Sequence, residues 1–126
     1  MKGRRMSKVS VIIPNYNGKK YLKDCLDAMK CQSFRDFEVL LVDNGSEDGS
    51  QDLVRKEYPW VQLISLKENT GFCGAVNQGI RNSASPFVIL LNNDTIADKD
   101  FVKELLKGIE DKPRAFSCQA KLLQMK

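Results

Sequence analysis

Three short polar segments of this chain each follow a run of apolar residues, and each holds groups suited to a charged ligand. They are residues 15–18, 43–46 and 92–95. The last segment ends the apolar run 87–91 and carries the carboxylate of Asp94. In open α/β sheets, ligands bind beyond the carboxyl ends of the strands, so an acid at this edge is a candidate for holding a metal–nucleotide complex. The alternative is an Asn/Asp turn that caps the following helix.

The two acids at strand ends, Asp43 and Asp94, are expected to serve opposite ends of one ligand. If the sheet order is third, second, first and then the strand at 87, two strand steps separate them, which is roughly 10 Å at about 4.8 Å per step. This spacing is too long for one shared ion but suits a nucleotide, from its base to its diphosphate. Asp43 is therefore a candidate acceptor for the imide N–H of uracil or thymine. Asp94 is a candidate ligand for Mg²⁺ or Mn²⁺, which prefer oxygen ligands.

A glycine-bearing loop provides further candidate contacts to the nucleotide. Asn69, Gly71 and Gly74 lie in it, and glycine, which has no Cβ, lets the backbone approach a ligand closely. Loop geometry and helix capping are the alternative roles. Asn77, in the helix that follows, is also a candidate nucleotide contact, with a structural hydrogen bond as the alternative.

These segments need strands and helices to position them. Apolar runs predict strands at 9–13, 37–42, 60–64 and 87–91, with an edge strand at 115–123. The unbroken run at 87–91 is expected to be covered on both faces of the sheet. Apolar residues at spacings of three and four predict helix faces made by three groups: Tyr21, Leu22, Cys25, Leu26 and Met29; Phe72, Ala75, Val76, Gly79 and Ile80; and Phe101, Val102, Leu105, Leu106 and Ile109. Ser46 and Asp98 are predicted N-caps. The alternation indicates an α/β fold, with a Rossmann-like, mostly parallel sheet flanked by helices.

The composition is that of one globular domain. The chain has 126 residues, 42% of them hydrophobic and 29% charged, with a net charge of +4. Without repeats or linkers, it is predicted to be a single nucleotide-binding domain over residues 1–126, with residues 1–8 flexible. Its longest apolar runs have five residues, against about 20 for a membrane span, and its basic start lacks an apolar signal region. We therefore expect a cytoplasmic location, with basic surface attraction to the inner membrane face as an additional possibility.

The residue types argue against several other kinds of site. The chain has no histidine and four cysteines without C-x-x-C spacing, so zinc sites and Ser-His or Cys-His nucleophiles are not expected, and the thiols are predicted to be reduced. Basic residues without interleaved aromatic residues do not favour nucleic acid. The sequence also lacks G-x-G-x-x-G, the P-loop pattern and the G-x-S-x-G elbow, the signatures of dinucleotide dehydrogenases, P-loop NTPases and α/β-hydrolases.

Over residues 9–123, the chain resembles the nucleotide-binding half of family-2 glycosyltransferases with the GT-A fold. The resemblance is carried, in the family's order, by the segments VSVIIPNYNG, FEVLLVDNGSEDGS, NTGFCGAVNQGI and FVILLNNDT. It implies inverting transfer of a sugar from a nucleotide diphosphate donor to an acceptor hydroxyl. It also implies that Pro14, Tyr16 and Asn17 border the nucleotide and that Asp43 reads the base.

The motif at 92–94 differs from the form found in many members of that family. Asn92-Asn93-Asp94 stands where many members carry Asp-x-Asp or three aspartates, so Asp94 is the remaining metal-binding acid and Asn93 is expected to contact the nucleotide. Val76 stands where an arginine is often found. The Asn-rich motif looks closest to the rhamnosyltransferase-like branch, which implies a UDP- or dTDP-linked donor without deciding between them.

The resemblance also bears on the catalytic base. In the family, the carboxylate that deprotonates the acceptor lies in a following half that this chain lacks, so the catalytic base is unknown. We therefore expect the donor-binding domain of a metal-dependent glycosyltransferase that acts on a saccharide or lipid-linked acceptor. Self-association through Leu122 and Leu123 is also expected, because that surface would otherwise contact the missing half.

Two other classes of function fit parts of the pattern. A non-catalytic nucleotide-binding or assembly module is the first alternative, because the motif has a single metal-binding acid. A receiver-like signalling domain is the second, but it needs acids clustered at adjacent strand ends, and Asp43 and Asp94 are too dispersed.

Overall fold

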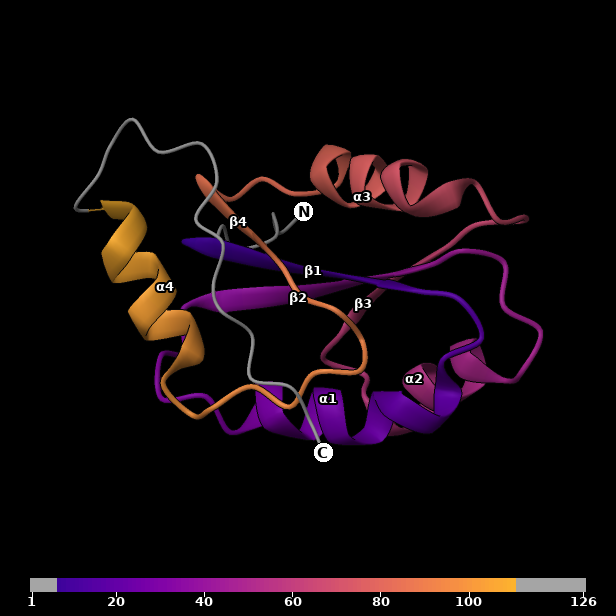
Figure 1. The fold of residues 1–126 in the computed structure, drawn as a ribbon, viewed down its shortest axis with the longest axis horizontal. Coiled ribbons are helices and arrows are strands. Elements are labelled where there is room, and N and C mark those ends of the chain that lie inside the picture. The colour runs from indigo at the N-terminus through magenta and orange to yellow at the C-terminus, as the bar shows by residue number, and fades with distance from the viewer. Residues whose placement is uncertain (1–6, 111–126) are drawn as a thin grey trace, which may run out of the picture.

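Four parallel strands form one sheet in the order β3-β2-β1-β4 in the computed structural model, which describes residues 7–110 (Figure 1). The strands are β1 (Val9–Asn15), β2 (Phe37–Asp43), β3 (Gln62–Ser65) and β4 (Phe87–Leu90). The helices are α1 (Lys19–Lys30), α2 (Ser50–Glu57), α3 (Gly71–Arg81) and α4 (Phe101–Glu110). None of the helices in this part of the chain is both long and apolar enough to cross a membrane. The predicted α/β fold is confirmed, and the strand order is the one assumed in placing Asp43 and Asp94 two strand steps apart.

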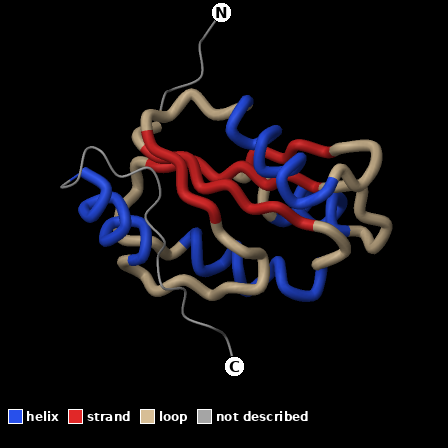
Figure 2. The backbone as a smooth tube through the Cα atoms, turned by 45° about the horizontal axis from the view of Figure 1, so that its top comes forward, coloured by secondary structure: helices blue, strands red, loops and turns tan. Residues whose placement is uncertain are grey.

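The two central strands are buried on both faces. Alternate side chains of a strand point to opposite faces of the sheet, and nearly every residue of β1 and β2 is buried. This burial follows from the layers of the fold, since α1 and α2 lie on one face of the sheet and α3 lies on the other (Figures 1 and 2). Continuous apolar runs, rather than alternating ones, are what such doubly covered strands require.

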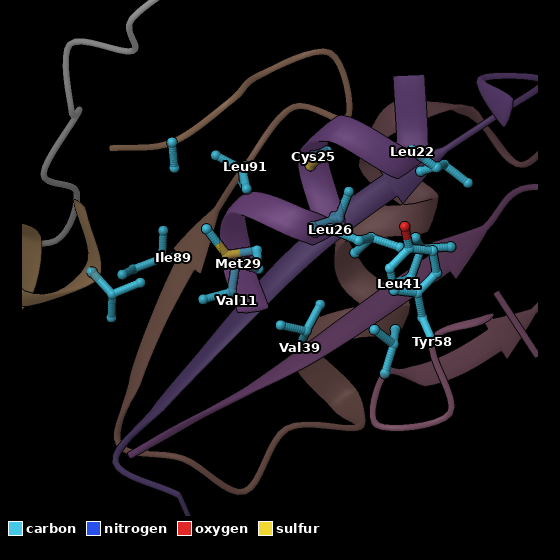
Figure 3. Packing of buried hydrophobic residues seen from close by; sticks show 14 of the residues in the cluster. Val11, Leu22, Cys25, Leu26, Met29, Val39, Leu41, Tyr58, Ile89 and Leu91 are labelled. Atoms are coloured by element: carbon cyan, nitrogen blue, oxygen red, sulfur yellow. The ribbon is translucent and has the colours of Figure 1, made fainter. Parts of the chain in front are cut away.

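The larger core fills the space between the sheet and α1, α2 and α4. The helix α1 contributes Leu22, Cys25, Leu26 and Met29, all fully buried, as their spacing predicts. Tyr21, expected on the same face, is instead 42% exposed. The helix packs against apolar residues in the strands or just after β4, which include Val11, Val39, Leu41, Ile89 and Leu91 (Figure 3).

The smaller core lies under α3. Ala75 packs there on Ile12, and a Cβ built on Gly79 would lie 2.6 Å from Ile12 Cγ2. Glycine at 79 therefore lets α3 lie close against β1. The two ends of the predicted helix face are not covered, because Phe72 and Ile80 are 59% and 47% exposed.

The prediction that the strand at 87 is covered on both faces is wrong for one of them. Ile89 is buried on the α1 side, but Leu90, at the end of β4, is 45% exposed. The physical reason is the position of α3, which lies over β1 and β2. Val88, on the same face of β4, is half-buried against the smaller core, whereas Leu90 extends beyond this cover.

The third strand begins later than predicted. It starts at Gln62 because Val61 N–H donates to Tyr58 O at 2.9 Å, in a turn that leaves Trp60 42% exposed. The predicted edge strand at 115–123 lies outside the described residues.

The burial difference between two leucines on strands predicts a difference in stability. Replacing the fully buried Leu41 with Ala should lower the free energy of unfolding by roughly 2–5 kcal/mol, through lost apolar burial and a residual cavity. The matched control, Leu90→Ala, should cost less than about 1 kcal/mol because that side chain is already partly in water. Urea unfolding followed by circular dichroism measures both, and equal losses would contradict the described core.

Candidate functional site

The three polar segments meet at the carboxyl edge of the sheet, and each places one side chain on the same face. On the α1 face, β1 and β2 each end on a polar residue two positions after a buried apolar one, and beyond the end of β4 a polar residue follows two positions after the buried Leu91. These polar residues are Asn15, Asp43 and Asn93. The parallel register pairs Asn15 directly with Asp43. We refer to these three side chains as the edge row.

Hydrogen bonds join the edge row from end to end. Asn93 Nδ2 donates to Asn15 Oδ1 at 2.7 Å, and Asn15 Nδ2 donates to Asp43 Oδ1 at 2.9 Å. Asn15 is 2% exposed and Asp43 is fully buried. Gly18 closes over the row, since a Cβ at this position would collide with Asn93 Nδ2 and Asn15 Oδ1. The row therefore connects the loop predicted to hold a cation to the loop predicted to read a base.

The Asp43 carboxylate is the most heavily hydrogen-bonded group of the row. Besides Asn15, it accepts from Ser46 N at 2.9 Å and from Gln51 Nε2 at 2.5 Å, both through Oδ2. A buried carboxylate needs such donors, because its charge is costly without them. The prediction that Asp43 reads a base stays a prediction, and a base N–H would have to join these three donors.

The loops after β1 and β2 are fastened to each other by Ser46. The prediction that Ser46 caps a helix is wrong, because α2 begins at Ser50 after Gly49. Its hydroxyl instead accepts from Asn17 N at 2.7 Å, and Asn17 Oδ1 accepts from Glu47 N at 2.8 Å. Asn17 has a φ of 50°, a left-handed conformation in which asparagine is enriched. Asn17 thus shapes the rim beside the edge row.

Asp48 makes a second tie between the same two loops. Its carboxylate accepts from Lys19 N at 2.9 Å and from the backbone and hydroxyl of Ser50. Partial burial acts to raise the pKa of Asp48, but these hydrogen bonds outweigh it and lower the pKa below the usual value. The start of α1 is therefore held against the loop that follows β2.

Asn44 holds the glycine-bearing loop. Its Oδ1 accepts from Thr70 N at 2.8 Å and its Nδ2 donates to Gly71 O at 3.0 Å, while Asn69 Oδ1 accepts from Gly71 N at 2.8 Å. Gly71 has a φ of 84° and no neighbouring atom within 4 Å of a Cβ built there. Its outer side consequently has room for a ligand, and the nucleotide contacts predicted for Asn69 and Gly71 stay predictions.

The remaining predicted contacts lie on open surface. Tyr16 is 51% exposed beside a half-buried Pro14. Asn77 is exposed on α3, about 9 Å along the axis from Gly71 at about 1.5 Å per residue. Within residues 7–110, no hydrogen bond is found for the Asn77 side chain, so the structural hydrogen bond expected as its alternative role is not found there. The structure thus brings Asp43 and Asn93 together through Asn15, and leaves Asn77 apart.

Asp94 is exposed at the open end of the edge row. The turn that carries it closes with Thr95 N donating to Asn92 O at 3.2 Å. Asp94 does not cap the following helix, because α4 begins at Phe101. Asp98 holds the turn before α4, since its O accepts from Phe101 N at 3.0 Å and its Oδ2 accepts from Asp100 N at 3.1 Å, so the predicted N-cap lies three residues before the first helical residue. The carboxylate of Asp94 is therefore available to a ligand.

The donor set around Asp94 fits a divalent cation only with help from a ligand. Within residues 7–110, no group of three His, Cys, Asp or Glu side chains is placed to hold a metal ion. Mg²⁺ characteristically binds through one or two carboxylates together with phosphate oxygens and waters. Asp94 with a bound diphosphate meets that requirement.

Sequence reasoning missed the two buried amides of the site, Asn15 and Asn44. Both lie in the polar segments that follow the first two strands, but neither is among the predicted nucleotide contacts, although each hydrogen-bonds partners outside its own loop. A usable signal was the first residue of each of the first two apolar strands. Aligning the strands at Val9 and Phe37 pairs Asn15 with Asp43, as the register shows.

The fold and these motifs have known relatives. The family model described as Glycosyl transferase family 2 matches residues 10–122. The chain belongs to glycosyltransferase family 2. Among curated proteins of this family, Glycosyltransferase GlyA of Streptococcus pneumoniae serotype 4 is 33% identical over 104 residues, which are 81% of this chain and 15% of that protein. The chain therefore spans a small part of this relative.

Solved structures of GT-A proteins share the fold. S. aureus TarS 1-349 in complex with UDP has a TM-score of 0.74 and 28% identity, and the match covers 82% of this chain and 32% of that one. Mannosyltransferase PcManGT from Pyrobaculum calidifontis, in complex with GDP-Man and Mn²⁺, has a TM-score of 0.75 and 26% identity, covering 86% and 34%. The chain therefore has the Rossmann-like fold of the GT-A nucleotide-binding half.

Cys25 lies directly beneath the turn at 92–95, and its environment predicts its reactivity. Its Sγ is 3.9 Å from Asn92 O, and burial, followed by the charge of Asp94, raises the pKa of Cys25 to about 12. Since the thiolate is the reactive form, iodoacetamide at pH 8 should alkylate the exposed Cys31 and Cys73 and spare Cys25 until the chain is unfolded. Peptide mass mapping measures this, and rapid alkylation of native Cys25 would contradict it.

The same pKa shift predicts a loss of stability at high pH. In the unfolded chain the thiol of Cys25 loses its proton near pH 9.0, whereas in the folded chain it keeps the proton to about pH 12. The unfolded state then binds fewer protons, so the free energy of unfolding falls as the pH rises between these values. Cys25→Ser should reduce this slope in chemical unfolding at pH 8 to 11, and the same substitution at exposed Cys31 should leave it unchanged.

Proposed function

We propose that this domain binds a nucleotide diphosphate-sugar donor at the carboxyl edge of its sheet. We further propose that the protein to which it belongs transfers the sugar, with inversion, to a hydroxyl of a saccharide or lipid-linked acceptor. The observation that carries the proposal is the meeting of segments 15–18, 43–46 and 92–95 at one edge, with the buried edge row between them and the exposed Asp94 at its end. Related structures that contain UDP, or GDP-Man with Mn²⁺, support it.

The edge offers different surroundings to the two ends of such a donor. The base end is assigned to the loop of Asp43, beside the open side of Gly71 and Asn69, where uracil or thymine would meet hydrogen-bonding backbone and amide groups. Tyr16 and Asn17 are exposed between the two ends and would border the nucleotide. A UDP- or dTDP-linked sugar is the donor class proposed.

The diphosphate end is assigned to Asn93 and Asp94. Asp94 would hold the divalent cation there, and Mg²⁺ or Mn²⁺, when bound, offsets negative charge on the departing diphosphate. Asn93 would contact the nucleotide from the edge row. No base for the acceptor hydroxyl is assigned among the residues of this chain, so the proposal for these residues is donor binding and orientation.

A non-catalytic nucleotide-binding or assembly module is the second candidate. The observation that favours it is the motif at 92–94, which provides one acid, Asp94, next to two amides. Release or transfer of labelled sugar from UDP- or dTDP-sugars by the chain would exclude this module, whereas nucleotide binding without any turnover would favour it.

Two further parts of the proposal concern the surroundings of the protein. A cytoplasmic location, at or near the inner membrane face, is proposed from the composition. Self-association through Leu122 and Leu123 stays a prediction, since both lie outside the described residues. A sharp monomer in size-exclusion chromatography at high concentration would contradict it.

The role of Asp94 is tested by the metal dependence of binding. Calorimetric titration of the chain with UDP, dTDP and GDP, each with and without Mn²⁺, should show tighter binding with the metal. Asp94→Asn keeps the shape of the side chain but removes its charge, and should reduce this metal-dependent gain in affinity roughly tenfold or more. The expected size is that of one contact to a charged group, about 1.5–3 kcal/mol.

The matched control is Asp98→Asn, another exposed aspartate after the same strand, at which Asn also preserves the turn that starts α4. It should bind all three nucleotides like the unaltered chain. Unchanged metal-dependent affinity in Asp94→Asn would remove Asp94 from the proposed site.

A further inference from the structure

The hydrogen bonds of the edge row all run in one donor-to-acceptor direction, and Asp43 determines that direction. An ionised carboxylate only accepts hydrogen bonds, whereas an amide side chain has one accepting end and one donating end. Because Ser46 N and Gln51 Nε2 already donate to Asp43 Oδ2, Asn15 must turn its Nδ2 toward Oδ1. The charge on Asp43 therefore sets the orientation of the Asn15 amide.

The same logic sets the orientation of Asn93. With its Nδ2 turned toward Asp43, Asn15 presents Oδ1 to the next strand, and Asn93 must donate its own Nδ2 to that oxygen, as the 2.7 Å hydrogen bond shows. The Oδ1 of Asn93 is then the end left over. Among residues 7–110, no donor to Asn93 Oδ1 is found, and this side chain is partly exposed next to Asp94.

Packing leaves little freedom for the row to turn over. Asn15 is 2% exposed, and Gly18 lies so close that a Cβ there would overlap both the Asn15 oxygen and the Asn93 nitrogen. A reversed Asn15 would point its NH₂ group at the NH₂ group of Asn93 and its oxygen at the Asp43 carboxylate. Both contacts would be unfavourable, so one orientation is selected.

We propose that Asn15 is a positioning residue that transmits the polarity of Asp43 across the sheet and presents Asn93 Oδ1 as an accepting oxygen toward the cation–diphosphate end of the donor. This inference rests on the proposed donor site. Asn15 itself is buried and touches no donor group. Its effect on binding passes entirely through Asn93.

A double-mutant cycle in the 126-residue chain tests this route. Asn15→Leu and Asn93→Leu should each reduce the Mn²⁺-dependent gain in UDP affinity roughly five- to tenfold, the value of about one hydrogen bond. The double variant should be no weaker than either single variant, because both remove the same contact. Losses that multiply in the double variant would overturn the proposal.

Two further variants keep the test decisive. Asn15→Ser retains a small polar group that is too short to bridge Asp43 and Asn93. It should lose the same part of the Mn²⁺-dependent gain as predicted for Asn15→Leu, and it replaces that variant in the test if the leucine variant unfolds. Asn82→Leu is the matched control. Asn82 is exposed just after the C-terminal end of α3, and its Nδ2 donates to Gln78 O. It should bind UDP like the unaltered chain.

A measurement without nucleotide separates this inference from the proposed function. In the ¹⁵N-labelled chain, the Asn93 side-chain proton that is bonded to Asn15 Oδ1 should exchange slowly with water. Asp43→Asn reverses the demand on the row, because the introduced amide must keep its oxygen toward Ser46 N and turn its NH₂ group to Asn15. Asn15 and Asn93 then turn over, and the Asn93 NH₂ group faces solvent and exchanges fast.

The outcomes are distinct. If the unaltered chain binds none of UDP, dTDP or GDP with Mn²⁺, the proposed donor site fails, and the row is judged by exchange alone. Slow exchange that becomes fast in Asp43→Asn supports the polarity of the row. Exchange at Asn93 that is the same in both chains overturns it.

Discussion

A charged carboxylate buried at the end of the central sheet is the constraint on which the binding edge depends. Asp43 is fully buried, and a carboxylate removed from water is tolerated only when donors replace the water. The donors come from three places in the chain: β1, the turn after β2, and the first turn of α2. Satisfying one charge therefore fixes the relative positions of segments that are distant in sequence.

The edge consequently has a rigid half and an open half. Around Asp43 and Asn44, side-chain oxygens and nitrogens are buried and paired, which fixes the loops before any ligand arrives. Around Tyr16 and Asp94, the side chains reach into solvent. A site preformed at one end and open at the other loses less conformational entropy on binding at the fixed end. Its open end is the part that a ligand must order.

The four described strands and the position of Asp94 beyond the last of them were predictable from sequence, because apolar runs and the polar segments that end them are strong signals. Contacts between elements were not predictable in this way. An apolar run shows that a strand could be buried on both faces, but not that α3 would leave Leu90 uncovered. Ser46 did not cap a helix because its hydroxyl accepts a hydrogen bond from the loop after β1. The side chain of Asn15 is bonded within the edge row to Asp43, which ends β2, and to Asn93, which follows β4. Local propensity describes turns well, but it does not specify which turns touch.

Gly18 shows how a substitution pattern at this edge should be interpreted. Its φ is −107°, an angle open to every amino acid, so the position does not require glycine for its backbone conformation. The requirement is one of space, since the volume of a single methyl group is already occupied by two amides. In sequence comparisons, the absence of alanine at position 18 would therefore indicate that the loops after β1 and β4 lie too close together for a Cβ. It would not indicate a hinge or the approach of a phosphate group to the backbone.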